Sequence, residues 1–510
     1  MTHPRTPVLI GAGQYTYRGD PLASPPPLAS MHVAATAAAR DAGLSVQALA
    51  NADLVGVVGF TIDSGGGGGR FPHLGNPPRA LAEALGAHPA HTVYSYMGGN
   101  TPQALVNWAS ERIARGEADF VLLAGAEFLG GLRKKLAAGA DLAAYSAGGA
   151  GGEPERFGDP RAGCTPQEAA HGLSAPVNTY PLFENALRAH RGEGLAEHAA
   201  RMGALFAPFT TVAAKNPNAW FPKAWTPADL AVPGPDNRMI GYPYPKRLNA
   251  IMDVDQAACV LMTSSERADA LGVAADKRVY LHGCADAAEL WNPLDRVNYH
   301  SSPAIGLCAR EAFAMAGKTP ADLSFIDLYS CFPVAVELAC AEIGLAEKDP
   351  RGLTVTGGLP YFGGPGNNYV MHSIAEMMAR LRAKPGAYGL VTANGWYLTK
   401  HAFGIYSTEP TEGAWKRRDP KTYQGEIDAL DHPEIAFAPE GEATIETYTV
   451  THAREGYRSG IVIGRDGRGR RFVANTPADE DTLKELESRE GVGRLGSVTS
   501  EEGRNLFIPE

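Results

Sequence analysis

The chain has 510 residues, with 46 Lys and Arg against 56 Asp and Glu, and a formal net charge of −10. Hydrophobic residues make up 44% and charged residues 20%, which is a globular composition and excludes an intrinsically disordered chain. The acidic balance offers no general attraction to nucleic acid or to an anionic membrane, so neither is expected as a partner. At about 100–200 residues per domain, the length predicts two to four domains.

Cysteine usage and apolar runs indicate the compartment. The six cysteines form no CxxC pair and are too sparse for a disulfide scaffold. The start, MTHPRTPVLIGAGQ, lacks the apolar core of a secretory signal, and no apolar run approaches the ~20 residues that cross a bilayer. We therefore expect no membrane insertion and a reducing, cytoplasmic setting.

The first quarter of the chain alternates strands and helices. Its predicted strands are residues 6–10, 53–60, 91–96 and 119–127, and its helices are residues 31–42, 79–85 and 103–115. Thr101 suits an N-cap and Pro102 a first helical position. The strand–helix–strand run over residues 91–127 predicts a right-handed βαβ unit in a parallel sheet.

The rest of the chain divides into three parts. Residues 129–250 are less periodic and rich in Gly, Pro, Trp and Tyr, which indicates an inserted subdomain, with helices at 179–191 and 195–206. A second helix–strand block follows. Its predicted strands are residues 255–262, 278–282, 325–329 and 389–394, and its helices are residues 303–316, 333–343 and 370–383. Beyond residue 410 the pattern predicts a small β-rich appendix with one charged helix at 479–490.

Three stretches together resemble the thiolase superfamily. They are GGNTPQALVNWASERIARGEADFVLLAGAE (98–127), LNAIMDVDQAACVLMTS (248–264), and residues 301–345 with the following GGLPYFGGPGNNYVMHSIAEMMARL (357–381). The resemblance covers roughly residues 5–405. It is strongest to sterol-carrier-type thiolases and to type-1 thiolase-like proteins (acetyl-CoA acetyltransferase-like) with an added C-terminal domain.

The resemblance implies a duplicated α/β fold. Two similar βαβαβαββ halves would form five layers, α/β/α/β/α, with a loop subdomain in the first half. The expected parts are residues 1–265 (with the insert at 129–250), residues 266–410, and an OB-like β-rich domain at 411–510. A coenzyme A thioester is implied as substrate or ligand, with no tightly bound cofactor. A homodimer is expected, or a monomer if the C-terminal domain covers the dimer face.

The resemblance places the family's reactive cysteine at Gly98. No cysteine precedes Cys164, so a shift of the alignment does not supply the missing thiol. The main-chain amides of Gly98, Gly99 and Asn100, ahead of a helix, can bind an anion or oxyanion. The alternative interpretation is that this run is only a tight turn and a cap.

The family's His-Asp-Cys-Phe motif aligns with Tyr329-Ser330-Cys331-Phe332. Tyr329 replaces the histidine, and a tyrosine can donate to an oxyanion or act as a general acid, although its usual pKa of ~10 makes it a poor base. Cys331 matches the motif's cysteine. A buried structural role is the alternative for Cys331, because free cysteines are most often small buried hydrophobes.

The two remaining motifs are also changed. The family's Gly-His-Pro aligns with Gly363-Gly364-Pro365, so Gly364 replaces a histidine. His372 could enter the pocket from the following helix or be a structural residue, and Asn367 and Asn368 could supply amide donors or only turns. The cysteine of the family's Cys-x-Gly is absent, and Asn394 or His401 could replace part of its function. Lys400 and His401 are equally compatible with a solvated pair.

The sequence gives little support for two other kinds of site, a metal site and a phosphate-binding loop. The 14 histidines are scattered without an HExxH motif or a Cys/His cluster, so no metal site is predicted. The glycine run at 65–69 is followed by Arg-Phe-Pro rather than Gly-Lys-Ser/Thr, which excludes a phosphate-binding P-loop.

Three functions remain open. The first is an enzyme that acts on acyl-CoA without acylating a cysteine, for example by retro-aldol C–C cleavage with Tyr329. The second is an acyltransferase that uses Cys331. The third is a non-catalytic protein that binds a CoA ester or a partner. We favour a thiolase-like acyl-CoA protein that is not a conventional Claisen thiolase.

Overall fold

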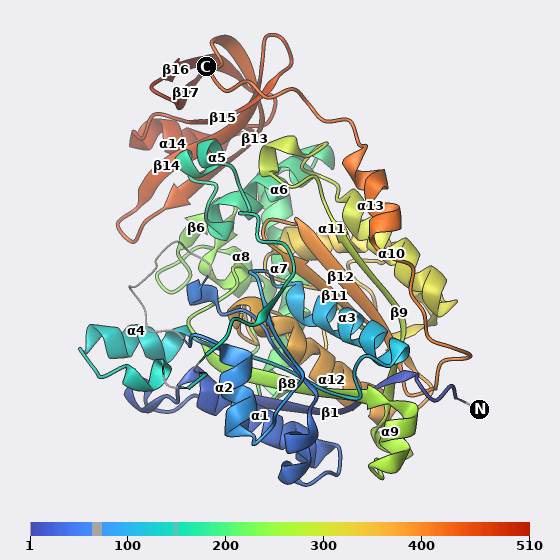
Figure 1. The fold of residues 1–510 in the computed structure, drawn as a ribbon. Coiled ribbons are helices and arrows are strands. Elements are labelled where there is room, and N and C mark those ends of the chain that lie inside the picture. Colours follow the sequence, from blue (N-terminus) through green and yellow to red (C-terminus); the bar gives the residue numbers. More distant parts are fainter. Residues whose placement is uncertain (1, 64–73, 147, 150) are drawn as a thin grey trace.

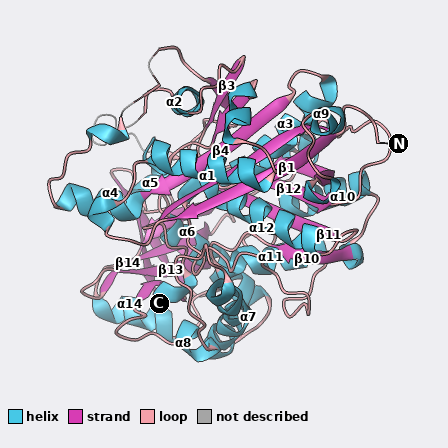
Figure 2. Cartoon of the chain, turned by 90° about the horizontal axis from the view of Figure 1, so that it is seen from below, coloured by secondary structure: helices cyan, strands magenta, loops and turns pink. Residues whose placement is uncertain are grey.

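The computed structural model describes residues 2–63, 74–146, 148–149 and 151–510, so the predicted glycine loop at 65–69 lies outside the described residues. One sheet crosses the body of the molecule in the order β10-β11-β12-β9-β1-β8-β4-β2-β3-β5 (Figures 1 and 2). Its first-half strands are β1 (Pro7–Thr16), β2 (Leu54–Val57), β3 (His91–Ser95), β4 (Phe120–Phe128), β5 (Glu155–Phe157) and β8 (Asp255–Ser264). Its second-half strands are β9 (Val279–Ala288), β10 (Leu323–Asp327), β11 (Tyr388–Gly395) and β12 (Lys400–Ser407).

The strand order confirms the duplication. In the first half β1, β8 and β4 pair antiparallel, and β4, β2 and β3 then pair parallel. In the second half β9, β12 and β11 pair antiparallel, and β11 and β10 pair parallel. A short antiparallel contact, in which Val8 faces Tyr280, joins the halves. The predicted βαβ unit is parallel, with β2 lying between β3 and β4.

Helices complete five layers. α1 (Pro27–Asp41) and α2 (Pro77–Ala84) cover the first-half strands, while α10 (Pro303–Ala316) and α11 (Pro333–Ile343) lie outside the second half. α3 (Thr101–Arg115) and α12 (Tyr369–Ala383) lie between the halves. Each of these two contacts both β8 and β11, so both flanks of the helix are covered, and the thiolase-type layering is confirmed.

The insert is mainly helical. It contains α4 (Leu129–Ala137), α5 (Pro166–Ala170), α6 (Pro176–His190), α7 (Leu195–Lys215), α8 (Pro227–Ala231), β6 (Met239–Gly241) and β7 (Tyr244–Pro245). α7 continues nine residues beyond its predicted end, because Phe209 and Ala213 extend its buried face past Pro208. The insert does not stand apart, since β5 pairs with β3 in the main sheet and β6 pairs with the C-terminal domain.

The C-terminal domain is a closed five-stranded barrel, which confirms the OB-like expectation. Its strands are β13 (Gly441–His452), β14 (Tyr457–Asp466), β15 (Arg471–Asn475), β16 (Leu495–Glu501) and β17 (Arg504–Pro509). β13 pairs with both β14 and β16, which closes the sheet on itself. α13 (Lys421–Asp428) precedes the barrel and contacts β9, whereas α14 (Glu480–Ser488) packs on β13 and β14.

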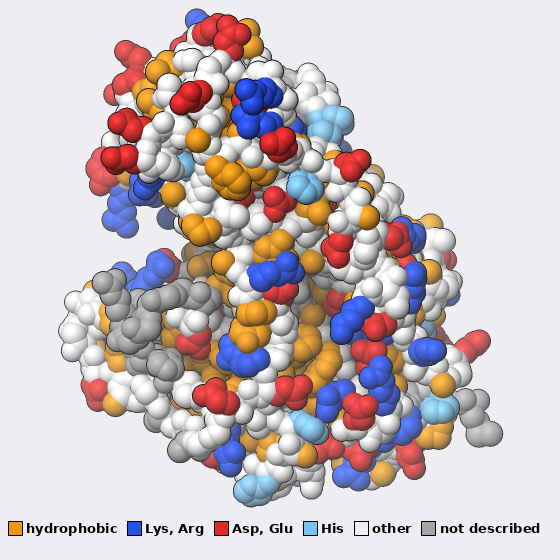
Figure 3. Space-filling model, turned by 45° about the horizontal axis from the view of Figure 1, so that its top comes forward, with side chains coloured by type: hydrophobic (Ala, Val, Ile, Leu, Met, Phe, Trp, Pro, Cys, Tyr) orange, Lys and Arg blue, Asp and Glu red, His pale blue; other side chains and the backbone are white. Residues whose placement is uncertain are grey.

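Buried polar contacts fix the barrel against the body. The side chain of Asn185 on α6 donates to the carbonyl oxygen of Tyr448 at 2.9 Å. Arg471 of the barrel, fully buried, donates to the carbonyl oxygen of Leu294 in the body at 2.9 Å, and Glu446 of the barrel holds the same guanidinium at 2.6 Å. The surface carries interspersed acidic and basic side chains on the face shown in Figure 3. Among the described residues, no helix has the length and hydropathy to cross a bilayer.

Candidate functional site

The turn before α3 is closed by neighbouring side chains. Gly98 has φ +155°, and a Cβ on it would lie 2.9 Å from the Nζ of Lys400 and also against the Oδ1 of Asn100. The N–H of Gly98 donates to the Oδ1 of Asn367 at 2.9 Å. The prediction that this amide can bind an oxyanion is therefore wrong, because the amide is already used. Asn100, rather than Thr101, occupies the N-cap position, because Thr101 already has helical geometry.

Asn367 is a positioning residue for that turn. Its Nδ2 donates to the carbonyl oxygen of Gly59 at 2.7 Å while its Oδ1 holds Gly98, so both ends of the amide are used. Asn368 faces Gly125 instead, and neither polar atom of its buried side chain has a hydrogen-bond partner among the described residues. The two neighbouring amides therefore differ, since only Asn367 contacts the predicted site.

Tyr329 reaches the same turn from the second half. It follows β10, its N–H donates to the Oγ1 of Thr392 at 2.9 Å, and its hydroxyl contacts the position that a Cβ on Gly99 would take. Its ring meets the ring of Tyr369 edge-on at 5.8 Å. Burial, with smaller contributions from Cys331 and Tyr369, raises the pKa of Tyr329 well above its usual value. The hydroxyl is therefore neutral at pH 7 and suited to donate a hydrogen bond.

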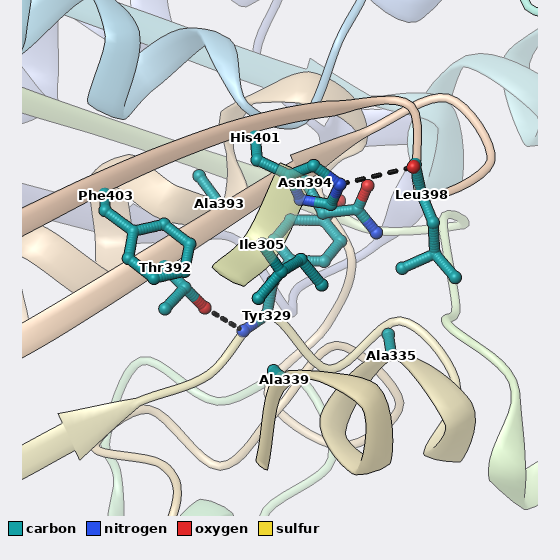
Figure 4. Close-up of a pocket in the computed structure, with 10 residues that line it drawn as sticks. All are labelled: Ile305, Tyr329, Ala335, Ala339, Thr392, Ala393, Asn394, Leu398, His401 and Phe403. Atoms are coloured by element: carbon teal, nitrogen blue, oxygen red, sulfur yellow. Dashed lines mark hydrogen bonds between the residues drawn. The ribbon is translucent and has the colours of Figure 1, made fainter. Parts of the chain in front are cut away.

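Asn394 and His401 lie beside Tyr329, as Figure 4 shows. They face each other across the β11–β12 pair and line, with Tyr329, a cavity of about 10 Å³ that has room for about one water. The Nδ2 of Asn394 donates to the Tyr180 hydroxyl at 2.9 Å. His401 contacts the carbonyl oxygen of Leu398 at 3.2 Å, and burial lowers its pKa to about 3, so the ring is neutral.

Lys400 is the site residue that the sequence did not single out. Only 6% of it is exposed, so the solvated-pair interpretation of Lys400 and His401 is wrong. Its Nζ donates to the carbonyl oxygen of Met97 and lies 5.8 Å from the ring centroids of Trp291 and Trp396. Burial lowers the pKa of Lys400 to about 8. The available signal was a lysine at the start of the mainly apolar run KHAFGIYS.

A strained hairpin turn between β11 and β12 positions Lys400. Trp396 and Leu398 have left-handed φ values of 55° and 56°, which are costly for bulky residues. The Tyr180 hydroxyl donates to the carbonyl oxygen of Trp396 at 2.9 Å and accepts from the N–H of Leu398. Buried Arg296 donates to the carbonyl oxygens of Tyr397 and Leu398, both at 2.9 Å. These contacts compensate for the strain.

Cys331 lies one contact farther from the turn. Its thiol is buried, and burial raises the pKa of Cys331 to about 12. A neutral thiol is a weak nucleophile. The other cysteines also have raised pKa values because of burial, and none of them lies in the turn before α3.

His372 and Gly364 lie away from the turn. The Nδ1 of His372 contacts the Oε1 of Gln14 at 2.8 Å, and burial lowers the pKa of His372 to about 3. The ring of Phe362 packs on His372 and on Tyr369, which in turn contacts Tyr329. Two aromatic rings thus connect His372 to Tyr329. Gly364 lies against Ile251, to whose carbonyl oxygen it donates at 2.8 Å.

A second buried cluster joins α6, α7 and α11, and we call it the carboxylate–histidine cluster. Its members are Glu184, Glu193, His198, Glu337, Glu347, Arg191 and Arg201. Glu184, His198 and Glu337 could supply ligands to a metal. However, both Arg191 and Arg201 lie 3.4 Å from Glu337, and Glu337 has a strongly raised pKa because of burial and Glu184. The carboxylates of this cluster therefore already pair with Arg191, Arg201 and His198.

Comparisons with known proteins agree with this geometry. Residues 423–503 match the family model of the thiolase-like protein type 1 additional C-terminal domain. No match is found among curated proteins. The Ltp2–ChsH2(DUF35) aldolase (21% identity, TM-score 0.55, 79% of this chain and 98% of that chain) shares the fold. So does an acetyl-CoA acetyltransferase from Syntrophomonas wolfei (14%, TM-score 0.52, 80% and 100%).

A fuller match is the crystal structure of a monomeric SCP2-thiolase like protein type 1 from Mycobacterium smegmatis. The two chains are 38% identical, each is covered over 99% of its length, and the TM-score is 0.84. Both the body and the barrel are therefore shared. This chain belongs to the SCP2-thiolase-like protein type 1 family.

Proposed function

We propose that the protein binds acyl-CoA thioesters with the thioester group at the turn before α3, and that it processes them without an acyl-cysteine. The observation that carries the proposal is the convergence of Tyr329, Asn394 and Lys400 on Gly98 and Gly99, where a thiolase would present its thiol. Main chain, a hydroxyl and an amine replace the sulfur there. Cys331 is a weaker candidate for acylation, because its thiol is buried and protonated.

The favoured reaction is retro-aldol C–C cleavage of a 3-hydroxyacyl thioester. Such a cleavage leaves negative charge on the thioester oxygen of the enolate, and a neutral donor held next to that oxygen lowers the barrier. Tyr329 is protonated and adjacent to the turn, which suits it to this role. The fold shared with the Ltp2–ChsH2(DUF35) aldolase is compatible with this chemistry but does not carry it.

The test separates binding from chemistry. Tyr329→Phe removes one hydroxyl from a buried ring, so we expect unchanged acetyl-CoA affinity in calorimetry and a loss of turnover of about 10²–10⁴-fold with short 3-hydroxyacyl-CoA substrates. Tyr369→Phe, which alters a neighbouring tyrosine, is the matched control and should retain turnover. Tight acetyl-CoA binding without turnover of any acyl-CoA by the wild type would instead support a non-catalytic binding protein. Absence of binding would refute the proposal.

We also propose that the chain is a monomer. β5 pairs in parallel with β3 and covers the edge of the first-half sheet, leaving a three-residue strand at that edge. A strand already paired on both sides cannot join the sheet of a second copy. Light scattering after size-exclusion chromatography should give the mass of one 53.9 kDa chain; a stable dimer would contradict the proposal.

A further inference from the structure

Lys400 takes the space that a side chain at residue 98 would fill. A Cβ on Gly98 would lie 2.9 Å from the Nζ of Lys400 and 3.0 Å from its Cε. Gly395 pairs with Lys400 across the β11–β12 hairpin, and a Cβ on Gly395 would lie 3.1 Å from the Cα of Gly98 and 3.2 Å from the Cε of Lys400. The lysine and the glycine are therefore complementary: the amine enters because residue 98 has no side chain.

The surroundings of the amine leave it poorly paired. Its oxygen partner is the neutral carbonyl of Met97, and Lys400 makes no salt bridge within the described part of the chain. The charged groups that act on it, Asp159 and Arg161, are paired with each other at 2.7 Å and have opposing effects on it. The indole rings of Trp291 and Trp396 each lie 5.8 Å from the ammonium group, within cation–π range.

We propose that Lys400 accepts the acyl group from a bound acyl-CoA, so that the site acylates itself on nitrogen where thiolases are acylated on sulfur. In the reaction, the neutral amine attacks the thioester carbonyl carbon, an N–C bond forms and the C–S bond breaks. CoA leaves as its thiolate, and the proton released by the nitrogen goes to that sulfur. The inference rests on the proposed function, because it requires the thioester at the turn before α3.

The product is an amide, which is stable, so the step modifies the site rather than forming a turnover intermediate. Acylation removes the charge of Lys400 and adds an acyl group to a crowded turn. The modified chain should therefore bind acetyl-CoA more weakly. A pKa of about 8 predicts that the acylation rate rises about tenfold per pH unit below pH 8 and levels off above it.

The experiment incubates the full chain with acetyl-CoA and follows intact mass and tryptic peptides. Lys400→Arg keeps the charge but replaces the amine with a guanidinium that stays protonated. Lys223→Arg is the matched control, because exposed Lys223 also lies over a tryptophan ring, 3.9 Å from that of Trp225. We expect one acetyl group on Lys400 in the wild type and in Lys223→Arg, and loss of that adduct in Lys400→Arg.

Calorimetry with acetyl-CoA on the same preparations distinguishes the two proposals. Binding without an adduct on Lys400 would overturn the acylation inference and leave the proposed function intact. Absence of binding would overturn both. Acetylation of surface lysines at the same rate in Lys400→Arg as in the wild type would show ordinary chemical acetylation and would overturn the inference. An acylation rate that keeps rising about tenfold per pH unit up to pH 10, instead of levelling off above pH 8, would also overturn it.

Discussion

Two regions bury positive charge in opposite ways. In the carboxylate–histidine cluster, His198 is bonded through both ring nitrogens, to Glu184 at 2.5 Å and to Glu193 at 2.7 Å. At the turn before α3, Lys400 is similarly buried but donates to the carbonyl oxygen of Met97, without a carboxylate partner within the described residues. The first region supplies full counter-charge, whereas the second supplies a neutral oxygen and two aromatic rings.

The pKa of the buried basic group is raised in the first region and lowered in the second. Burial alone would lower the pKa of His198, but the bonds to Glu184 and Glu193 outweigh it and raise that pKa. For Lys400, burial dominates and lowers the pKa to about 8. A buried group whose counter-charges are present stays in its charged form, whereas one that lacks them costs stability and gives up its proton more readily. This difference is our reason for assigning chemistry to Lys400 and structure to His198.

The largest expected effect comes from His198. His198→Ala leaves the fully buried carboxylate of Glu184 without its cationic partner, whereas Glu193 keeps Arg201, so we expect a loss of about 3–5 kcal/mol in the free energy of unfolding. Urea denaturation at pH 7 measures it, with exposed His432→Ala as the control that should change little. A loss below 1 kcal/mol would mean that the cluster is not the stabilising region we take it to be. Because the folded-state pKa of His198 is raised, its contribution is complete below pH ~6.5 and is lost as the pH rises through the raised value.

Lys400→Met should stabilise the protein, and with the opposite dependence on pH. Folding lowers the pKa of Lys400 from 10.5 to about 8, so the unfolded chain binds the extra proton between these values and stability rises with pH across that window. Removing the charge should therefore add about 3 kcal/mol at pH 7, and the gain should shrink to below about 1 kcal/mol by pH 10 as the unfolded chain also begins to lose the proton. Urea denaturation of both chains from pH 7 to 10 tests this. A variant that is less stable than the wild type at pH 7 would break the comparison.

Gly98→Ala should have the smallest of the three effects. The added Cβ would meet Lys400 and Asn100 and would require a φ of +155°, so we expect a cost of about 1–3 kcal/mol. Gly43→Ala isolates the backbone contribution, because Gly43 has φ +74° and open space around it. The excess of Gly98→Ala over Gly43→Ala, measured by thermal unfolding, reports the contacts with Lys400 and Asn100 together. Equal costs would show that Lys400 moves aside freely.

Local sequence patterns were sufficient to predict most helices and strands in the body of the molecule. α10 and α11 occur at their predicted bounds, and α3 begins two residues earlier than predicted, because Pro and Gly mark these helix ends directly in the sequence. β12 was missed. A run such as KHAFGIYS is buried on both faces, so it lacks the alternation of a half-exposed strand, and its position depends on pairing with β9 and β11. Strands β16 and β17 of the C-terminal barrel were also not predicted.

The sequence alone determined what the candidate site lacks and one of the groups that it contains. A missing thiol at Gly98 and a tyrosine at 329 can be read from their positions within motifs. Only the tertiary structure decided that Lys400 fills the vacant space, that Asn367 holds the turn, and that Cys331 and His372 do not reach it. The reason is physical: these contacts join segments more than 260 residues apart, and whether a lysine is solvated or buried depends on which strands enclose it rather than on its neighbours in the chain.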